Sequence, residues 1–431
     1  MLSSSTKRVN KLKLYTMNNL EELSNIYKFT KEQIFEIEVV AKVLPFRTNS
    51  YVVEELIDWS KVPEDPFYKL TFLNKEMLLP QHYEQVAKAL EQRKAKEEVD
   101  VIVADIRKQL NPHPANQLTA NIKTLEGEVV EGLQHKYQET CLVFPSSGQT
   151  CFAYCTFCFR WPQFVGVTSL KFATDESKRY LDYIKEHKEL TDVLFTGGDP
   201  LLMKANLLKQ YIEPLLTKDF AHIRSIRIGT KVLGFWPYRL LTDPDAEELL
   251  ALFRKVVNSG KHLAIMAHFN HYKELLTQAQ RKASIRILET GAQIRTQSPI
   301  INHINDSEDI WARMWQEQVE QAMIPYYMFI ERNTGPQHYF SLPLVKVFEI
   351  YRNAINKLSG LGRTARGPVM SAIPGKISID GVVEIDKQKA FVLSFLQARN
   401  TDWVKRPFFA KYDSEATWFT ELQPLIGQNF F

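Results

Sequence analysis

The sequence is poor in cysteine, in net charge and in long apolar runs. Only four of its 431 residues are cysteines, too few for the disulfide frameworks of secreted domains. No apolar run approaches the ~20 residues of a membrane span, and no hydrophobic signal-peptide core follows the first residues. The net charge of +4 is small for this length and gives no clustered basic surface for nucleic acid. We therefore expect a cytoplasmic protein with no membrane or nucleic-acid partner.

The length predicts two or three domains. Residues 1–131 are typical of a helical accessory domain, with a capping box at Thr30 and Gln33 and a Pro- and Asn-rich linker at 111–117. In residues 132–360, short apolar runs alternate with amphipathic helices, as expected for a parallel sheet. Residues 361–431 form a small C-terminal α+β segment with a hairpin predicted to turn at Asp380-Gly381, followed by an aromatic tail.

The central domain contains six predicted strand and helix pairs. The predicted strands are 142–145, 193–196, 225–229, 263–268, 293–297 and 326–331. The predicted helices are 175–189, 204–216, 243–259, 278–290, 309–323 and 344–358. Candidate site residues lie near the C-terminal ends of these strands. We therefore predict an α/β fold built on a partial (β/α)6 TIM-like barrel, with its chemistry at that rim.

Three of the four cysteines, Cys151, Cys155 and Cys158, lie in one short aromatic segment. Thiolates with the spacing C-x3-C-x2-C can converge on one side of a turn and bind an iron-sulphur cluster. Three ligands on a cubane of four irons leave one iron open for a small molecule. The segment lacks the paired C-x2-C knuckles of a structural zinc site. The alternative is that the three are buried, reduced thiols that pack as small apolar side chains.

Further polar residues follow the predicted strands. Gly197-Gly198-Asp199 follows the second strand, where two glycines let the backbone approach a ligand, although Gly-Gly after a strand is usually only a turn. His268 ends the fourth strand and Gln297 the fifth; such a histidine is more often a structural hydrogen-bonding group than a catalyst. Lys376 lies in a glycine turn, where a lysine is usually solvated, but a desolvated one can form a Schiff base.

Taken in order, these segments resemble the lysine 2,3-aminomutase family of radical SAM enzymes over residues 132–376. The matching segments are Gly132 to Tyr137, the cysteine segment, Gly197-Gly198-Asp199, Arg227 to Thr230, His268 to His271, Gln297-Ser298, Asn305-Asp306, Pro325 to Tyr327 and Pro374 to Lys376. The resemblance implies a 4Fe-4S cluster on Cys151, Cys155 and Cys158, with S-adenosylmethionine (SAM) on its open iron. One electron would then cleave SAM to a 5'-deoxyadenosyl radical.

The resemblance also assigns roles to the remaining site residues. Gly197, Gly198 and Asp199 would line the methionyl part of SAM, and His268 and Gln297 would lie near its ribose. Lys376 would carry pyridoxal 5'-phosphate (PLP), with Tyr137 beside it, while an amino group moves from carbon 2 to carbon 3 of the substrate. Arg160 matches the clamp for the substrate α-carboxylate, which a planar guanidinium binds through two hydrogen bonds. An external electron donor such as a flavodoxin or ferredoxin, and a homo-oligomer, are implied as partners.

Two substrate positions depart from the lysine enzymes, in which two aspartates hold the distal ammonium. Here these positions fall on Arg332 and Ser371, so a lysine ammonium would face a cation in a dry pocket. We therefore predict an acidic substrate such as glutamate. A register slip that turns Glu331 inward would instead favour lysine.

The PLP site departs from the family as well. The loop before Lys376 is shortened, Phe329 stands where a tyrosine is expected, and Thr140 stands near the position of a phosphate-side arginine. A divergent radical SAM enzyme that lacks PLP aminomutase activity is therefore an alternative. A non-enzymatic zinc or electron-transfer protein, the third class, would not need the polar residues at the rim.

Overall fold

The computed structural model describes residues 11–111, 124–125, 128–166, 173 and 177–430. A single eleven-stranded sheet dominates the described part of the chain, and its strands neighbour one another in chain order. These strands are β5 (Leu133–Tyr137), β6 (Thr140–Val143), β7 (Asp192–Phe195), β8 (Ser225–Thr230), β9 (His262–His268), β10 (Gln293–Ile300), β11 (Ile324–Ile330), β12 (Arg366–Ser371), β13 (Gly375–Ile385), β14 (Gln388–Ala398) and β15 (Pro407–Lys411).

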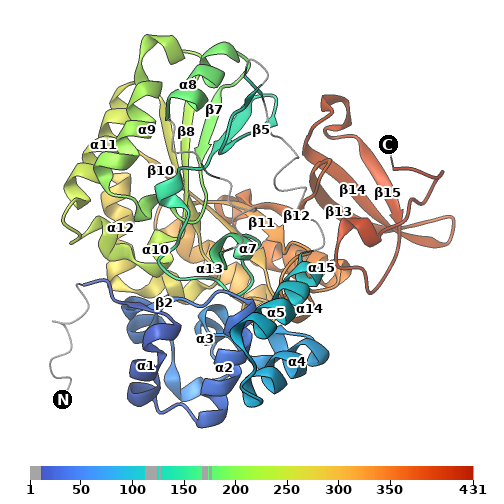
Figure 1. Cartoon of the computed structure of the whole chain (residues 1–431). Helices are drawn as coiled ribbons and strands as arrows, with labels where there is room; N and C mark the ends of the chain where they lie inside the picture. Colours follow the sequence, from blue (N-terminus) through green and yellow to red (C-terminus); the bar gives the residue numbers. More distant parts are fainter. Residues whose placement is uncertain (1–10, 112–123, 126–127, 167–172, 174–176, 431) are drawn as a thin grey trace.

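The strands from β6 to β12 are parallel, whereas β5 at one edge and β13 to β15 at the other pair antiparallel. The two edges are not paired, so the sheet is an open, partial barrel (Figure 1). All six predicted parallel strands are confirmed, and β12 adds a seventh that the sequence analysis did not predict. The predicted α/β fold class is therefore confirmed.

Helices cover the outer face of the parallel strands (Figure 1). These helices are α8 (Ser177–Glu186), α9 (Ala205–Ile212), α11 (Ala246–Asn258), α12 (Gln278–Leu288), α13 (Glu308–Glu320) and α15 (Leu344–Asn356). The short helices α7 (Trp161–Phe164), α10 (Val232–Phe235) and α14 (Gln337–Phe340) lie in the segments that follow β6, β8 and β11, and Phe164 and Phe235 line the cavity inside the barrel. Strand residues alternate between two environments. In β8, Ile226 and Ile228 are fully buried, whereas Arg227 and Gly229 line the cavity inside the barrel.

The N-terminal region packs against one end of the barrel and is mainly helical (Figure 1). Its helices are α1 (Leu20–Tyr27), α2 (Lys31–Val43), α3 (Pro66–Thr71), α4 (Pro80–Glu91) and α5 (Lys96–Leu110), and its strands β1 (Leu14–Tyr15) and β2 (Thr48–Asn49) pair with each other. A further short hairpin, β3 (Thr124–Leu125) with β4 (Glu128–Val129), precedes β5. The capping box is present, since the Thr30 hydroxyl accepts from the Gln33 amide at 3.1 Å. Apart from Asn111, the predicted linker lies outside the described residues.

The C-terminal strands continue the barrel sheet, and the predicted hairpin turn is wrong. β13 runs straight through Asp380-Gly381, where the pairing with β14 shifts register by a bulge. The chain turns at Asp386-Lys387, two residues with positive φ of 49° and 66°, as a tight hairpin turn requires. A glycine inside a strand therefore marks a bulge here and not a turn. No helix in the described part of the chain is long and apolar enough to cross a membrane.

Candidate active site

A cavity of about 400 Å³ opens at the carboxyl ends of the parallel strands. All of the predicted site residues line it, although they come from widely separated segments: Tyr137, Cys151, Cys155, Cys158, Arg160, Gly197, Gly198, Asp199, His268, Gln297, Arg332, Ser371 and Lys376. Ligands bind at this end of parallel α/β sheets. The individual roles of these residues stay predictions.

The three cysteines line the cavity as half-buried free thiols. Burial raises the pKa of each thiol. Among described residues, only His135, His187 and Glu189, outside the cavity, form a group whose ligand atoms all lie within 4.8 Å of one another. The cysteine sulphurs are therefore more widely spread than in a mononuclear zinc site, where Zn–S bonds of about 2.3 Å hold them closer. An all-sulphur donor set fits an iron-sulphur cluster.

The N-terminal region holds the cysteine segment in place. The Tyr154 amide donates to the Arg47 carbonyl at 2.9 Å, and the Thr156 amide donates to the Leu70 carbonyl at 3.0 Å. The side-chain amide of buried Asn49 in β2 donates to the Phe152 carbonyl at 3.1 Å. The sequence analysis assigned this region no chemical role. The signal that could have revealed it is the polar run Arg47 to Ser50 between apolar residues, of which Thr48, Asn49 and Ser50 are buried.

The Gly197-Gly198-Asp199 segment packs tightly against the start of the cysteine segment. A Cβ on Gly198 would lie 2.4 Å from the Thr150 carbonyl oxygen, so only glycine fits there. The Asp199 carboxylate accepts hydrogen bonds from the Thr230 hydroxyl at 2.7 Å and from the Lys231 amide at 2.8 Å. Burial raises its pKa to about 6, against the effect of these donors. Asp199 therefore ties together the loops that follow β7 and β8.

His268 presents a polar atom without a partner to the cavity. Its buried Nε2 has no hydrogen-bond partner among the described residues. Burial, and next the charge of Lys231, lower the pKa of His268 well below its usual value, so the ring is neutral. The ring packs edge-on against Phe157, 6.0 Å between centroids. A neutral imidazole in this position can bond a ligand hydroxyl, as the predicted contact with a SAM ribose requires.

Lys376 lies between two tyrosine rings. Its Nζ is 4.7 Å from the centre of the Tyr327 ring and 5.4 Å from that of Tyr137. Burial, and next the charge of Lys136, lower the pKa of Lys376 well below its usual value, which favours the nucleophilic amine. The buried Tyr137 hydroxyl has no hydrogen-bond partner within the described chain. An amine of lowered pKa beside an unsatisfied hydroxyl fits a PLP-binding lysine.

Gln397 orients Lys376 and was not predicted from the sequence. Its Oε1 accepts from Lys376 Nζ at 2.7 Å, while its Nε2 donates to the Glu139 carboxylate at 3.0 Å. The second bond fixes the orientation of the amide. Gln397 lies in β14 and Glu139 follows β5, so this chain of bonds also links the two ends of the open sheet.

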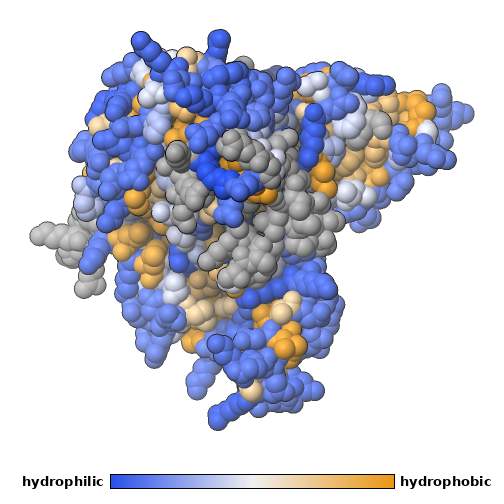
Figure 2. Space-filling view, turned by 45° about the horizontal axis from the view of Figure 1, so that its top comes forward, coloured by the Kyte–Doolittle hydropathy of each residue, from blue (hydrophilic) through white to orange (hydrophobic). Residues whose placement is uncertain are grey.

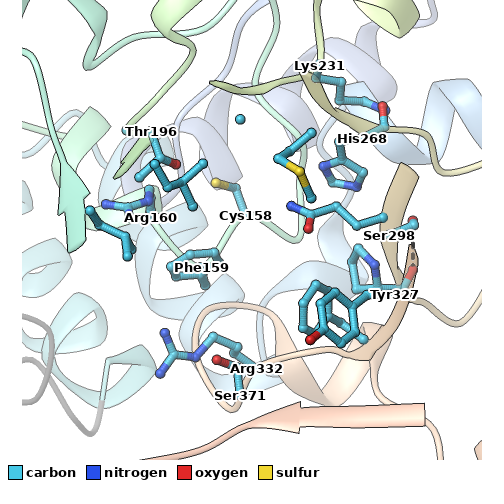
Figure 3. A pocket seen from close by; sticks show the side chains of 18 of the residues that line it. Cys158, Phe159, Arg160, Thr196, Lys231, His268, Ser298, Tyr327, Arg332 and Ser371 are labelled. Carbon is cyan, nitrogen blue, oxygen red and sulfur yellow. Dashed lines mark hydrogen bonds between the residues drawn. The ribbon is translucent and has the colours of Figure 1, made fainter. Parts of the chain in front are cut away.

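Two guanidinium groups flank one aromatic ring on the cavity wall (Figure 3). The Cζ atoms of Arg160 and Arg332 lie 5.2 and 5.1 Å from the centre of the Phe159 ring. Burial lowers the pKa of Arg160 to about 10, which leaves it cationic at pH 7. None of the ion pairs found in the described part of the chain involves either arginine.

Glu331 also lines the cavity, next to Arg332 in the chain. Both of its buried carboxylate oxygens are without a hydrogen-bond partner in the described structure. Burial alone raises its pKa well above its usual value, which favours the protonated acid. The structure therefore brings both Arg332 and Glu331 to the cavity, and burial disfavours the charged form of Glu331.

Curated relatives of this chain are aminomutases. It is 31% identical over 409 residues, 94% of this chain and 95% of the other, to a protein of Aquifex aeolicus named "Putative L-lysine 2,3-aminomutase". It is 24% identical to the L-lysine 2,3-aminomutase of Methanococcus maripaludis, over 77% of this chain and 65% of that one. It is 26% identical to the glutamate 2,3-aminomutase of Clostridioides difficile, over 49% of this chain and 47% of that one. No protein-family model matches.

Among solved structures, a radical SAM methyltransferase from Sphaerobacter thermophilus matches with a TM-score of 0.38 and 14% identity, over 82% of this chain and 93% of that one. A likeness this weak carries no argument of its own. The match to the Aquifex aeolicus relative, in contrast, covers nearly the whole of both chains. On that match the chain belongs to the lysine 2,3-aminomutase family, and the protein is an isomerase, a radical SAM aminomutase.

Proposed function

We propose that this aminomutase depends on PLP and moves the α-amino group of an acidic amino acid, such as glutamate, from carbon 2 to carbon 3. The observation that carries the proposal is the pair Arg160 and Arg332, two cations on either side of Phe159 with no carboxylate partner in the described chain. Two such cations match the two carboxylates of a dicarboxylic amino acid.

The substrate ends would be bound by different residues. Arg160 would bind the α-carboxylate, as a planar guanidinium can with two parallel hydrogen bonds. Arg332 and Ser371 would bind the side-chain carboxylate. A lysine ammonium at the same place would face the Arg332 cation inside a cavity of low dielectric, which disfavours lysine.

The residues around Lys376 are suited to PLP. Lys376 would hold the cofactor covalently, Tyr137 and Tyr327 would pack against it, and Gln397 would orient the lysine amine. When bound, PLP supplies an electron-accepting ring that stabilises the migrating amino group. Because residue 140 is a threonine and not an arginine, the PLP phosphate would be bound by other cations that line the cavity, such as Arg399.

Family membership implies a 4Fe-4S cluster and SAM. Cys151, Cys155 and Cys158 would supply the three sulphur ligands, and the unsatisfied Nε2 of His268 would bond the ribose of SAM. After reduction of the cluster, the cluster and SAM together would supply a radical for hydrogen abstraction from the substrate. The aromatic side chains around the cysteines would exclude water from the cluster.

A second candidate substrate is lysine. It is favoured by the names of most of the relatives and by the unpartnered carboxyl of Glu331. A radical SAM enzyme without PLP is the remaining alternative.

One screen separates these functions. Anaerobic protein with reconstituted iron, PLP, SAM and a reductant would be incubated with L-glutamate, L-aspartate or L-lysine, and the β-amino acid products identified by mass spectrometry. The Cys155→Ala variant serves as the blank. We expect a β-amino acid from an acidic substrate alone. Product from lysine alone would contradict the acidic preference, and no product from any amino acid would favour the divergent enzyme.

A homo-oligomer in the cytoplasm, reduced by a flavodoxin or ferredoxin, is proposed as the working form. Figure 2 presents a mostly hydrophilic face with apolar residues on the C-terminal strands. Exposed apolar side chains in this part of the chain include Ile373, Val383, Val404 and Ile426. Apolar residues of this kind are a candidate subunit contact.

A further inference from the structure

His135, His187 and Glu189 form a group of side chains outside the cavity, at one edge of the sheet. His135 lies in β5, the edge strand, whereas His187 and Glu189 lie between α8 and β7. One ring nitrogen of each histidine and one carboxylate oxygen of Glu189 lie within 4.8 Å of one another. A zinc ion holds nitrogen and oxygen ligands at about 2.0–2.2 Å, so small side-chain rotations would bring the three atoms into one coordination sphere.

Backbone hydrogen bonds hold the two segments together without any ion. The amides of Thr191 and Asp192 both donate to the Glu139 carbonyl, at 3.0 and 3.1 Å, and tie the start of β7 to the residues that follow β5. The Leu190 amide donates to the His187 carbonyl at 3.1 Å, which turns the chain next to the group. The fold itself therefore brings the three side chains together, so an ion would bind to a largely preformed site.

The hydrogen bonds of the two imidazoles set their tautomers. His187 Nδ1 donates to the Tyr183 carbonyl at 2.8 Å, and His135 Nε2 donates to the Gln138 carbonyl at 3.0 Å, because a carbonyl oxygen can only accept. In the neutral rings, the lone pairs therefore lie on His187 Nε2 and His135 Nδ1. Metal-bound histidines commonly donate their second nitrogen to a carbonyl in this way, which orients the ring toward the ion.

Tyr183 contacts both histidines, and Glu189 supplies a negative charge. The Tyr183 ring stacks on His187 with 3.8 Å between centroids, and its hydroxyl lies 2.8 Å from His135 Nδ1. An ion would take the place of the hydroxyl hydrogen as the partner of this nitrogen. The Glu189 carboxylate is exposed, and none of the ion pairs found in the described part of the chain involves it. It can therefore bind a cation without losing an ion pair.

We infer that His135, His187 and Glu189 bind a zinc ion that joins the edge strand β5 to the segment between α8 and β7. Two imidazole nitrogens and one carboxylate suit zinc with water in a fourth position, whereas calcium and magnesium favour oxygen ligands. The site lies outside the cavity, so the inference does not depend on the proposed function. Because β5 also carries Tyr137 into the cavity, the ion would hold in place the strand that supplies one cavity wall.

The test is a zinc titration of the anaerobic, iron-reconstituted protein, freed of loosely bound metal on a chelating resin. Titration calorimetry compares wild type with His187→Ala and Glu189→Gln. His262→Ala, which removes an exposed histidine at the start of β9, is the matched control. X-ray absorption at the zinc edge then identifies the ligand atoms, because Zn–N bonds of about 2.0–2.1 Å differ from Zn–S bonds of about 2.3 Å.

We expect one zinc ion per chain in wild type and in His262→Ala, with nitrogen and oxygen ligands and no sulphur. His187→Ala should bind zinc at least about tenfold more weakly, since even the partners of metal ligands commonly contribute that much to affinity. Tyr183→Phe keeps the stacked ring but removes the hydroxyl that competes for His135 Nδ1, so it should bind zinc at least as tightly as wild type. If His187→Ala does not fold, Glu189→Gln, which changes an exposed side chain, replaces it and should weaken zinc binding.

Three results would overturn the inference, and they are distinguishable. Equal zinc affinity in wild type and His187→Ala, or in Glu189→Gln where that variant replaces it, would remove the group from zinc binding. Sulphur around the bound zinc would place the ion on cysteines instead. Weaker zinc binding by Tyr183→Phe would mean that the tyrosine hydroxyl, and not His135 Nδ1, faces the ion.

Discussion

Glu331 and Arg332 are consecutive residues that both line the cavity, yet burial affects their charges differently. The Glu331 carboxyl has no partner in the described structure, and burial raises its pKa, which favours the protonated form. The Arg332 guanidinium has its pKa lowered by burial, but it starts so high that the group stays cationic. The cavity wall is therefore positive where the distal end of the substrate would lie.

The substitution Glu331→Gln tests the charge of this residue. Because a neutral amide replaces a neutral acid of similar shape, the affinity for glutamate should change less than about twofold. Titration calorimetry on the loaded enzyme measures it. Arg332→Gln is the matched comparison, and it should weaken glutamate binding at least about tenfold. If Glu331→Gln instead abolished binding of L-lysine, Glu331 would be an ionised ligand for an ammonium group.

Lys136 should reduce the stability of the protein without ligands. Burial, and next the charge of Arg332, lower its pKa in the folded chain to about 7, below the ordinary 10.5. The unfolded chain therefore binds the additional proton between these values, and the wild type loses stability as the pH falls from about 10 to 7. Lys136→Met should raise the free energy of unfolding at pH 7 by about 1–3 kcal/mol, after allowance for partial exposure.

Thermal melts of the two proteins from pH 7 to 9.5 measure this effect. The difference in melting temperature should shrink as the pH rises, because the free-energy cost of removing the lysine proton on folding falls as the pH approaches the unfolded pKa of 10.5. A variant that is less stable than wild type at every pH would mean that Lys136 contributes packing and not a buried charge.

At the scale of elements, the cysteine segment depends on an N-terminal region far away in the chain. Asn49 in β2 joins the cysteine segment to the end of α10, since its side-chain amide donates to the Phe152 carbonyl at 3.1 Å and to the Phe235 carbonyl at 3.0 Å. Its Oδ1 also accepts from the Val52 amide at 3.0 Å. A fully bonded and buried amide of this kind fixes the conformation of the segments that it joins.

Asn49→Ala should therefore lower cluster occupancy as well as stability. We expect less than about half of the wild-type iron per chain after reconstitution, because residues that support metal ligands commonly contribute tenfold or more to metal affinity. Iron and sulphide assays measure it. Thr30→Ala, which removes the cap of α2 and costs about 1 kcal/mol, is the control that should keep normal iron. Equal iron loss in both variants would mean that Asn49→Ala lowers the iron content only by lowering the stability of the protein.

The elements that the sequence predicted well are those with a strong local pattern. The six parallel strands and their helices follow from the alternation of apolar runs and amphipathic segments. β12 was missed because Gly367-Pro368 inside it is typical of a turn, and the hairpin was misplaced because Gly381 marks a bulge. All three clustered cysteines line the cavity, as expected from their close spacing in one segment, and their role as cluster ligands stays a prediction. Lys136, Asn49 and Gln397 were missed because their contacts join residues far apart in the chain.

At the scale of the whole molecule, the sheet is open, but its two sides are linked across the cavity. Lys136 bonds Ser371, and Glu139 bonds Gln397, which in turn orients Lys376. The N-terminal region contacts the cysteine segment at one end of the barrel, and β13 among the C-terminal strands supplies Lys376 (Figure 1). Each of the three parts of the chain therefore contributes to one cavity. Because these parts meet at one cavity, our central claim is that an iron-sulphur cluster and PLP act there on one substrate.

The most direct test of that claim needs no substrate. Absorption spectra of the anaerobic, iron-reconstituted protein would be recorded before and after addition of PLP, followed by borohydride reduction and mass mapping of modified lysines, with Lys376→Met as the control. The account predicts broad iron-sulphur absorption together with a reduced pyridoxyl group on Lys376 that is missing from the variant. Iron-sulphur absorption with no specific modification of Lys376 would contradict it.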